Sequence, residues 1–130
     1  MPGFESIMGL QFENLIINNR FSLYHILQIN PADVVYDNPF FQTKTKKQDG
    51  CQIDFLIQTK LNTLYVIEIK FSKNPVGLSV IESVKAKIKR LSLPKNRVCI
   101  PVLIHVNGVT NQLIDENYFY SIINFSDFLN

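Results

Sequence analysis

The sequence predicts a single α/β domain, residues 1–130, with a central mixed sheet flanked by helices. Three observations predict this class. Short runs rich in Ile, Val, Phe and Tyr, typical of strands, are interrupted by a longer segment whose apolar residues have helical spacing. Hydrophobic residues make up 46% of the chain, enough for a substantial core. No repeat or linker divides the chain, so we expect the order helix, strand, strand, strand, helix, strand, strand.

The elements before the central region are a helix, a short helical or irregular stretch, and a strand. Apolar residues at mixed intervals predict an amphipathic helix over residues 4–18. A second stretch, 21–29, ends near Pro31, because proline disfavours helical continuation. Residues 34–42 predict a first strand, and Pro39 within it indicates an irregularity at an edge of the sheet.

The central region predicts a β-hairpin. Residues 51–58 and 64–71 are apolar, β-prone runs separated by a short polar segment. If the turn is centred in that segment, Asp54 lies opposite Glu68, and Lys70 shares their face of the sheet. The opposite face is then apolar at every position. Its side chains are Ile53, Phe55, Ile57, Tyr65, Ile67, Ile69 and Phe71.

The second half of the chain predicts a helix followed by two strands. An apolar stripe at helical spacing follows Ser79, which together with Glu82 matches a capping box, and Pro94 ends the helix. Residues 98–106 form a continuous apolar run that predicts a buried strand, parallel to its neighbour after the helical crossover. Residues 118–125 predict a last strand with a short helical tail.

The acidic residues of the hairpin indicate a metal site. Two carboxylates about 5 Å apart repel by roughly 3 kcal/mol at an effective dielectric constant near 20, and one lysine neutralises only one of them. Mg²⁺ or Mn²⁺ would compensate, with oxygen ligands from Asp54, Glu68 and the backbone carbonyl of Ile69. Lys70 would then orient the attacking water or stabilise the phosphorus centre. The alternative is a solvent-exposed cluster of cross-strand charges without function.

The basic residues surround this candidate site. Residues 44–97 contain twelve of the thirteen Lys and Arg residues and four acids, whereas the segments on either side are acidic. This distribution favours an anionic partner such as nucleic acid. The alternative is a lysine-rich, solvated helix face. The candidate phosphate contacts are Lys44, Lys46, Lys47, Lys85, Lys87, Lys89 and Arg90.

Hydropathy and cysteine usage give the remaining expectations. No run approaches the length of a membrane span and no signal peptide opens the chain, so we expect a cytoplasmic protein without a membrane partner. Cys51 and Cys99 lie in strand-like runs and are expected to be structural thiols.

The element order and the D…E-x-K motif resemble the restriction-endonuclease-like, or PD-(D/E)XK, nuclease superfamily. Residues 50–57 and 66–72 look more narrowly like the nuclease-like C-terminal domain of prokaryotic AAA+ family ATPases, and 9–16 is similar to the first helix of that domain. The proline that gives the superfamily its name is absent, since Ile53 precedes Asp54.

The resemblance implies a restriction-endonuclease-like three-layer core and assigns roles to four residues. Asp54 and Glu68 would be metal ligands, Lys70 the catalytic lysine, and Glu13 a first-helix glutamate that approaches the metal. It also implies an AAA+ ATPase domain as a partner, in cis or in trans, so that the chain would be either a domain excised from a larger ATPase or a stand-alone remnant of one. A glycine-rich ATP-binding loop is absent from this sequence.

Two functions follow as hypotheses. The first is metal-dependent hydrolysis of phosphodiester bonds in nucleic acid, with DNA as the expected substrate. The second is a catalytically silent module that binds nucleic acid, or that contacts an AAA+ ATPase or a second copy of itself as a homodimer. The intact D…E-x-K residues favour the first hypothesis, whereas the small size without a specificity domain favours the second, or a nuclease that needs its partner.

Overall fold

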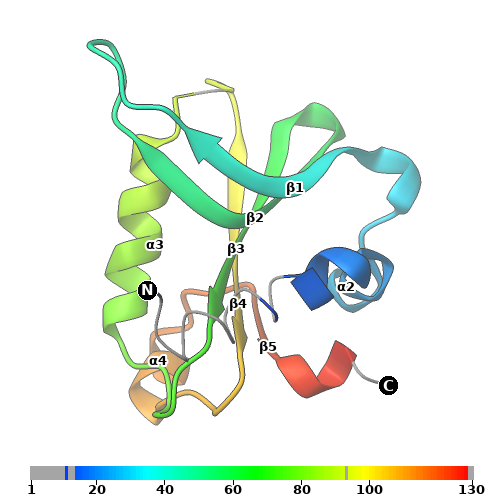
Figure 1. Ribbon diagram of the computed structural model, residues 1–130, viewed down its shortest axis with the longest axis vertical. Coiled ribbons are helices and arrows are strands. Elements are labelled where there is room, and N and C mark those ends of the chain that lie inside the picture. The colour runs from blue at the N-terminus through cyan, green and yellow to red at the C-terminus, as the bar shows by residue number, and fades with distance from the viewer. Residues whose placement is uncertain (1–10, 12–13, 93, 129–130) are drawn as a thin grey trace.

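The computed structural model describes residue 11 and residues 14–92 and 94–128, which form an α/β domain (Figure 1). Residues 14–18 are helical. The rest of the helix predicted over 4–18, apart from residue 11, lies outside the described residues. The helices and strands are α2 (Arg20–Leu27), β1 (Val34–Gln42), β2 (Cys51–Thr59), β3 (Thr63–Lys70), α3 (Ser79–Arg90), β4 (Val98–His105), α4 (Asn111–Glu116) and β5 (Ser121–Asn124). Short 3-10 turns occur at Pro31–Asp33, Lys60–Asn62 and Phe125–Phe128.

The five strands form one mixed sheet in the order β1-β2-β3-β4-β5. β1, β2 and β3 pair antiparallel, whereas β3, β4 and β5 pair parallel. α3 makes the crossover from β3 to β4 that a parallel pair requires. The prediction of an α/β fold with a mixed sheet and flanking helices is confirmed, as are the edge position of β1 and the parallel pairing of the strand predicted over 98–106.

The core lies in two layers, one on each face of the sheet. α3 covers one face, and α2 with the C-terminal 3-10 turn covers the other (Figure 1). The layer under α3 contains Leu56, Leu64, Val66, Val80, Ile81, Val84, Leu103 and Leu113. The layer under α2 contains Leu23, Leu27, Phe55, Ile57, Ile67, Val102, Ile104 and Ile123. At about 25 cal/mol per Å² of buried apolar area, these layers supply the main stabilisation of the fold.

The hairpin of β2 and β3 has the predicted register. Phe55 lies opposite Ile67 and Thr59 opposite Thr63, around a connection in which Leu61 has a φ of 65°. One side chain departs from the predicted pattern: Ile53 packs in the layer under α3, not with Phe55 on the other face. The prediction for Ile53 is therefore wrong.

A bulge in β2 explains this departure. Asn38 of β1 pairs with Leu56, but Phe40 pairs with Ile53, so two steps along β1 correspond to three along β2. The extra residue interrupts the strict alternation of side chains in the segment that contains Asp54. Bulges commonly re-aim a side chain next to a functional site, and this one lies directly at the first acid of the motif.

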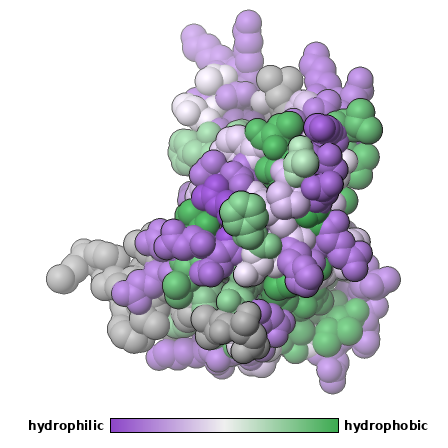
Figure 2. Space-filling view, turned by 90° about the vertical axis from the view of Figure 1, so that its right-hand side faces the viewer, coloured by the Kyte–Doolittle hydropathy of each residue, from purple (hydrophilic) through white to green (hydrophobic). Residues whose placement is uncertain are grey.

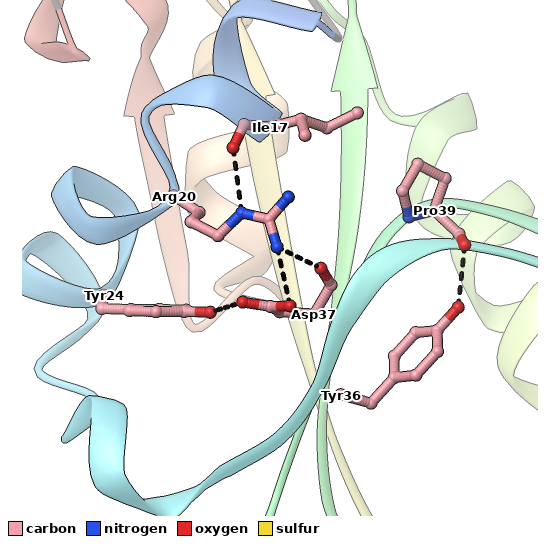
Figure 3. Close-up of polar contacts among 6 residues, drawn as sticks. All are labelled: Ile17, Arg20, Tyr24, Tyr36, Asp37 and Pro39. Carbon is pink, nitrogen blue, oxygen red and sulfur yellow. Dashed lines mark hydrogen bonds and ion pairs between the residues drawn. The ribbon is translucent and has the colours of Figure 1, made fainter.

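A polar cluster attaches α2 to the edge strand β1 (Figure 3). Nη1 of Arg20 donates to the Asp37 carboxylate at 2.8 Å and to its backbone carbonyl at 3.0 Å, while Nε donates to the carbonyl of Ile17 at 3.0 Å. The hydroxyl of Tyr24 also donates to the Asp37 carboxylate. Burial and this carboxylate raise the pKa of Tyr24. The cluster fixes the position of α2 against the sheet.

Two further predictions differ from the structure. Residues 111–116 form the helix α4, capped by the side chain of Thr110, where no element was expected. The N-cap of α3 is Leu78, without a side-chain capping bond, so the predicted capping box of Ser79 and Glu82 is wrong.

The side of the molecule that carries α2 has hydrophobic side chains in separate groups among hydrophilic ones (Figure 2). Among the described residues, no helix is both long and apolar enough to cross a membrane.

Candidate nuclease site

Asp54 lies on β2 at the bulge, one residue beyond the last paired position, Phe55 opposite Ile67. Its Oδ2 accepts a hydrogen bond from the backbone N–H of Ile69 at 2.8 Å, so the side chain provides a contact between β2 and β3 beyond the last backbone pair of the ladder. Burial and the nearby charge of Glu68 raise the pKa of Asp54, although the Ile69 hydrogen bond and two lysines oppose the shift. The carboxylate is thus held in a position where its negative charge is costly.

Glu68 lies on β3, which is flanked by β2 on one side and β4 on the other. The residue is only 3% exposed. A buried carboxylate needs a close cation or several hydrogen bonds to remain charged. Lys87 provides this contact from α3: its Nζ lies 2.8 Å from Oε2 and 3.2 Å from Oε1.

Two lysines therefore contact Glu68, in unequal ways. Nζ of Lys70 lies 3.5 Å from Oε1, and its side chain is 41% exposed, whereas the side chain of Lys87 is 24% exposed. Burial lowers the pKa of Lys87, but the hydrogen bond and charge of Glu68 outweigh this effect and raise it above its ordinary value. Lys87 is the principal partner of Glu68, and Lys70 is left the more accessible of the two.

The two acids and their lysines line an open cavity of about 570 Å³ between the sheet, α3 and the connection from β1 to β2. The charged side chains at its wall are Asp54, Glu68, Lys44, Lys70, Lys87 and Arg90. Its volume is in the range of about 300–1,000 Å³ that is typical of small-ligand sites. Basic groups outnumber acidic ones, so the cavity suits an anion.

The structure brings together only part of the predicted phosphate-contacting set. Lys44 and Arg90 line the cavity. Lys87 also lines it, but its ammonium group is engaged by Glu68. Lys46, Lys47, Lys85 and Lys89 are exposed outside the cavity wall. Lys85 pairs with Glu82 at 3.9 Å on the exposed side of α3.

The predicted metal ligands were Asp54, Glu68, the carbonyl of Ile69 and Glu13. Asp54, Glu68 and the residue Ile69 line the same cavity. Glu13 lies outside the described residues. Within the described ranges, no group of three or more His, Cys, Asp or Glu side chains lies close enough to hold a metal ion. Among the described residues, a metal would therefore depend on two carboxylates and backbone oxygen.

These oxygens fit a hard divalent cation, with one condition. Mg²⁺ and Mn²⁺ prefer carboxylate, carbonyl and water ligands, which this wall offers. The raised pKa of Asp54 indicates excess negative charge beside Glu68, and a cation would relieve it. Lys87 contacts both oxygens of Glu68, so a metal ion would have to share these oxygens with the ammonium group or displace it.

Two residues of the site were not singled out in these roles from the sequence. Lys87 lies three residues after Val84 and four before Leu91, both buried, so helical spacing alone indicates that it projects towards the sheet. Gln42 is 6% exposed and connects three segments. Its Nε2 donates to the carbonyls of Asp49 and Arg90 at 2.7 Å each.

Oε1 of Gln42 accepts from the backbone N–H and the hydroxyl of Ser92, both at 3.0 Å. The end of β1 is therefore fastened to the C-terminal end of α3, beside the cavity. An isolated glutamine at a strand end gives no sequence signal for this role, because two of its partners, Arg90 and Ser92, lie far away along the chain.

No protein-family model and no curated protein matches this chain. Two solved structures are similar in fold. A repair endonuclease from Pyrococcus abyssi aligns with a TM-score of 0.55 and 16% identity, over 95% of this chain and 48% of the other. A protein of unknown function, AF1548, aligns with a TM-score of 0.54 and 15% identity, over 85% of this chain and 56% of the other.

The chain thus spans about half the length of the structures that it resembles. At this identity the likeness concerns the fold, and it confirms an endonuclease-like α/β architecture with an open, mixed sheet. The more specific resemblance to AAA+ ATPase domains stays a prediction.

Proposed function

We propose that the chain is a metal-dependent nuclease that hydrolyses phosphodiester bonds, with DNA as its substrate. The observation that carries this proposal is that Asp54 and Glu68 line the same open cavity, whose wall is basic. A buried acid beside a half-buried one is costly unless the two have a task, and basic side chains around them favour a polyanion. The endonuclease-like fold supports the same reaction class.

The residues have separate tasks in this proposal. A hard divalent cation held by Asp54, Glu68 and the Ile69 carbonyl would polarise the phosphodiester and lower the pKa of a water molecule. Lys70, the more exposed lysine, orients the attacking water or stabilises the negative charge that develops on the phosphate. Lys44 and Arg90 hold phosphates at the cavity wall.

The test is cleavage of labelled single-stranded and double-stranded DNA with Mg²⁺ or Mn²⁺. Asp54→Asn and Lys70→Ala should each abolish cleavage. Matched controls are Asp49→Asn, an exposed acid, and Lys60→Ala, a lysine at the hairpin tip that pairs with Asp33 at 3.8 Å. Both controls should leave cleavage unchanged. Cleavage that survives Asp54→Asn and Lys70→Ala would refute the assigned site.

One observation favours the second candidate, a catalytically silent nucleic-acid-binding module. Lys87 already neutralises Glu68 through two short contacts, an arrangement that is stable without a metal. Calorimetric titration with Mn²⁺ separates the two functions. Binding to the wild type and not to Asp54→Asn supports the nuclease, whereas DNA binding without any Mn²⁺ binding supports the silent module.

A further inference from the structure

Phe41 is an exposed aromatic residue in a position that the structure holds firmly. Its side chain is 71% exposed, although it lies within β1 and pairs with Gln52. The next residue, Gln42, is buried and makes the four hydrogen bonds to Asp49, Arg90 and Ser92 described above. Because the ring is exposed, it contributes little buried apolar area to the fold. Because its backbone is fixed, the ring offers a preorganised flat surface to a ligand.

Phe41 also lies on the boundary between two cavities of different character. On one side is the cavity of about 570 Å³ that contains the acids and the basic wall. On the other is a cavity of about 640 Å³ whose lining residues carry no charge. The lining of this second cavity is Phe40, Phe41, Gln42, Thr43, Gln48, Gln58, Ser92 and Pro94.

This division matches the two parts of a nucleotide. The phosphate is anionic and suits the cavity with Lys44, Lys70 and Arg90. The base is flat, uncharged and rich in hydrogen-bonding groups, and suits an aromatic ring beside neutral amides and hydroxyls. A base inside a duplex is already stacked on both faces, so its face is closed to a protein ring.

We propose that Phe41 stacks on an unpaired base next to the scissile phosphodiester, so that the site takes single-stranded nucleic acid or a segment unpaired at the cleavage point. This inference rests on the proposed function, since it assumes that the acid cavity receives the backbone of the same strand. Stacking supplies affinity without dependence on base sequence, because every base has a π-face.

The experiment measures binding in the presence of a chelator, so that it is independent of cleavage. Fluorescently labelled oligonucleotides, single-stranded DNA, single-stranded RNA and duplex DNA, are titrated with the wild type, Phe41→Ala and Phe41→Trp. Phe21→Ala is the matched control, because Phe21 is 69% exposed and lies on α2, away from both cavities. Circular dichroism checks that each variant keeps the wild-type fold.

Phe41→Ala should weaken single-strand binding by about 5-fold to 150-fold, which is the loss of one stacked base. Phe41→Trp should restore it, and Phe21→Ala should leave it unchanged. Duplex binding should be the same for the wild type and Phe41→Ala. A single-stranded probe with 2-aminopurine should lose fluorescence on binding the wild type, because stacking quenches this base, and should keep it with Phe41→Ala.

Equal single-strand affinity of the wild type and Phe41→Ala would overturn the inference, as would an equal loss on single strands and duplexes. Its failure is distinguishable from that of the proposed function. If single-strand binding depends on Phe41 but Mg²⁺ never leads to cleavage, the stacking inference stands and the proposed nuclease function is refuted. If the protein cleaves DNA but its single-strand affinity does not depend on Phe41, the nuclease function stands and the stacking inference is refuted.

Discussion

Replacement of Lys87 by methionine tests the ion pair at the centre of the candidate site. Methionine keeps the length and apolar character of the lysine stem and removes only the ammonium group. Glu68, 3% exposed, then loses its contacts at 2.8 Å and 3.2 Å. Lys70 remains as its cationic neighbour, 3.5 Å away.

The expected cost follows from the burial of the pair. Removal of one partner of a buried ion pair costs about 3–5 kcal/mol, because the other charge is left uncompensated. Lys70 retains part of the interaction, but solvent screens its 41% exposed side chain. We therefore expect the lower limit, about 3 kcal/mol of unfolding free energy at neutral pH. A domain with an unfolding free energy of about 5–15 kcal/mol tolerates this loss, so the variant should stay folded and melt about 10 °C below the wild type.

Urea and thermal unfolding in a chelator measure this loss. Lys85→Met is the matched control on the same helix, because Lys85 is 54% exposed and pairs with Glu82 at 3.9 Å in solvent. An exposed pair of this kind contributes less than about 1 kcal/mol. Addition of Mn²⁺ should then raise the melting temperature of Lys87→Met by more than that of the wild type, because Lys87 no longer competes for Glu68.

Two results would refute this reasoning. If Lys87→Met is as stable as Lys85→Met in the chelator, the ion pair contributes nothing to the fold. If Mn²⁺ stabilises Lys87→Met less than it stabilises the wild type, then Lys87 supports metal binding and does not oppose it.

Three further substitutions test other features. Burial and Glu68 raise the pKa of Asp54, so the folded protein takes up this proton at a higher pH than the unfolded chain, and stability falls as pH rises between the two values. In a chelator, Asp54→Asn should therefore have a higher urea midpoint than the wild type at about pH 7. The difference should disappear below about pH 4, near the ordinary pKa of aspartate. A stability gain that persists at the lower pH would contradict a cause in the charge of Asp54. Tyr24→Phe, which removes the hydrogen bond to Asp37, should cost about 1–2 kcal/mol in urea unfolding, and no change would show that the cluster does not fasten α2. Leu61→Asn should stabilise the protein by up to about 1 kcal/mol, because Leu61 has a φ of 65° and is 95% exposed, and a lower melting temperature would indicate that the leucine side chain is needed.

The pairing of the hairpin could be predicted because two independent constraints agree. The short connection between residues 59 and 63 limits the register, and the apolar face of the strands excludes a slip by one residue. Phe55 and Ile67 lie opposite each other for these reasons. The position of Glu68 follows from the same register, whereas Asp54 lies at the bulge, beyond the last pair of the ladder.

The bulge and α4 could not be predicted in the same way. A bulge leaves composition and periodicity almost unchanged, so the switch of Ile53 to the layer under α3 depends on pairing with Phe40, a contact distant in sequence. α4 has only six residues, from Asn111 to Glu116, too few to show a helical period. Its buried residue, Leu113, packs in the core layer under α3, a tertiary contact that sequence periodicity does not reveal.

Lys87 changes what the acid pair requires. From the sequence, only one lysine, Lys70, is expected beside the two carboxylates of Asp54 and Glu68, and this excess of negative charge indicates a metal ion. In the structure two carboxylates lie beside two ammonium groups, so their formal charges balance without a metal. The compensation is uneven, however, because both lysines contact Glu68, while the pKa of Asp54 is raised.

A divalent cation bound here would therefore gain most at Asp54, and at Glu68 it would compete with the contacts of Lys87. Nucleic acid in the same cavity would offer the displaced ammonium group a phosphate partner. Binding of the metal and binding of the strand would then favour each other, since each relieves the charge imbalance that the other creates. In this scheme Lys87 would stabilise Glu68 until both arrive, which would give a function to a half-buried lysine on the face of α3 that packs on the sheet.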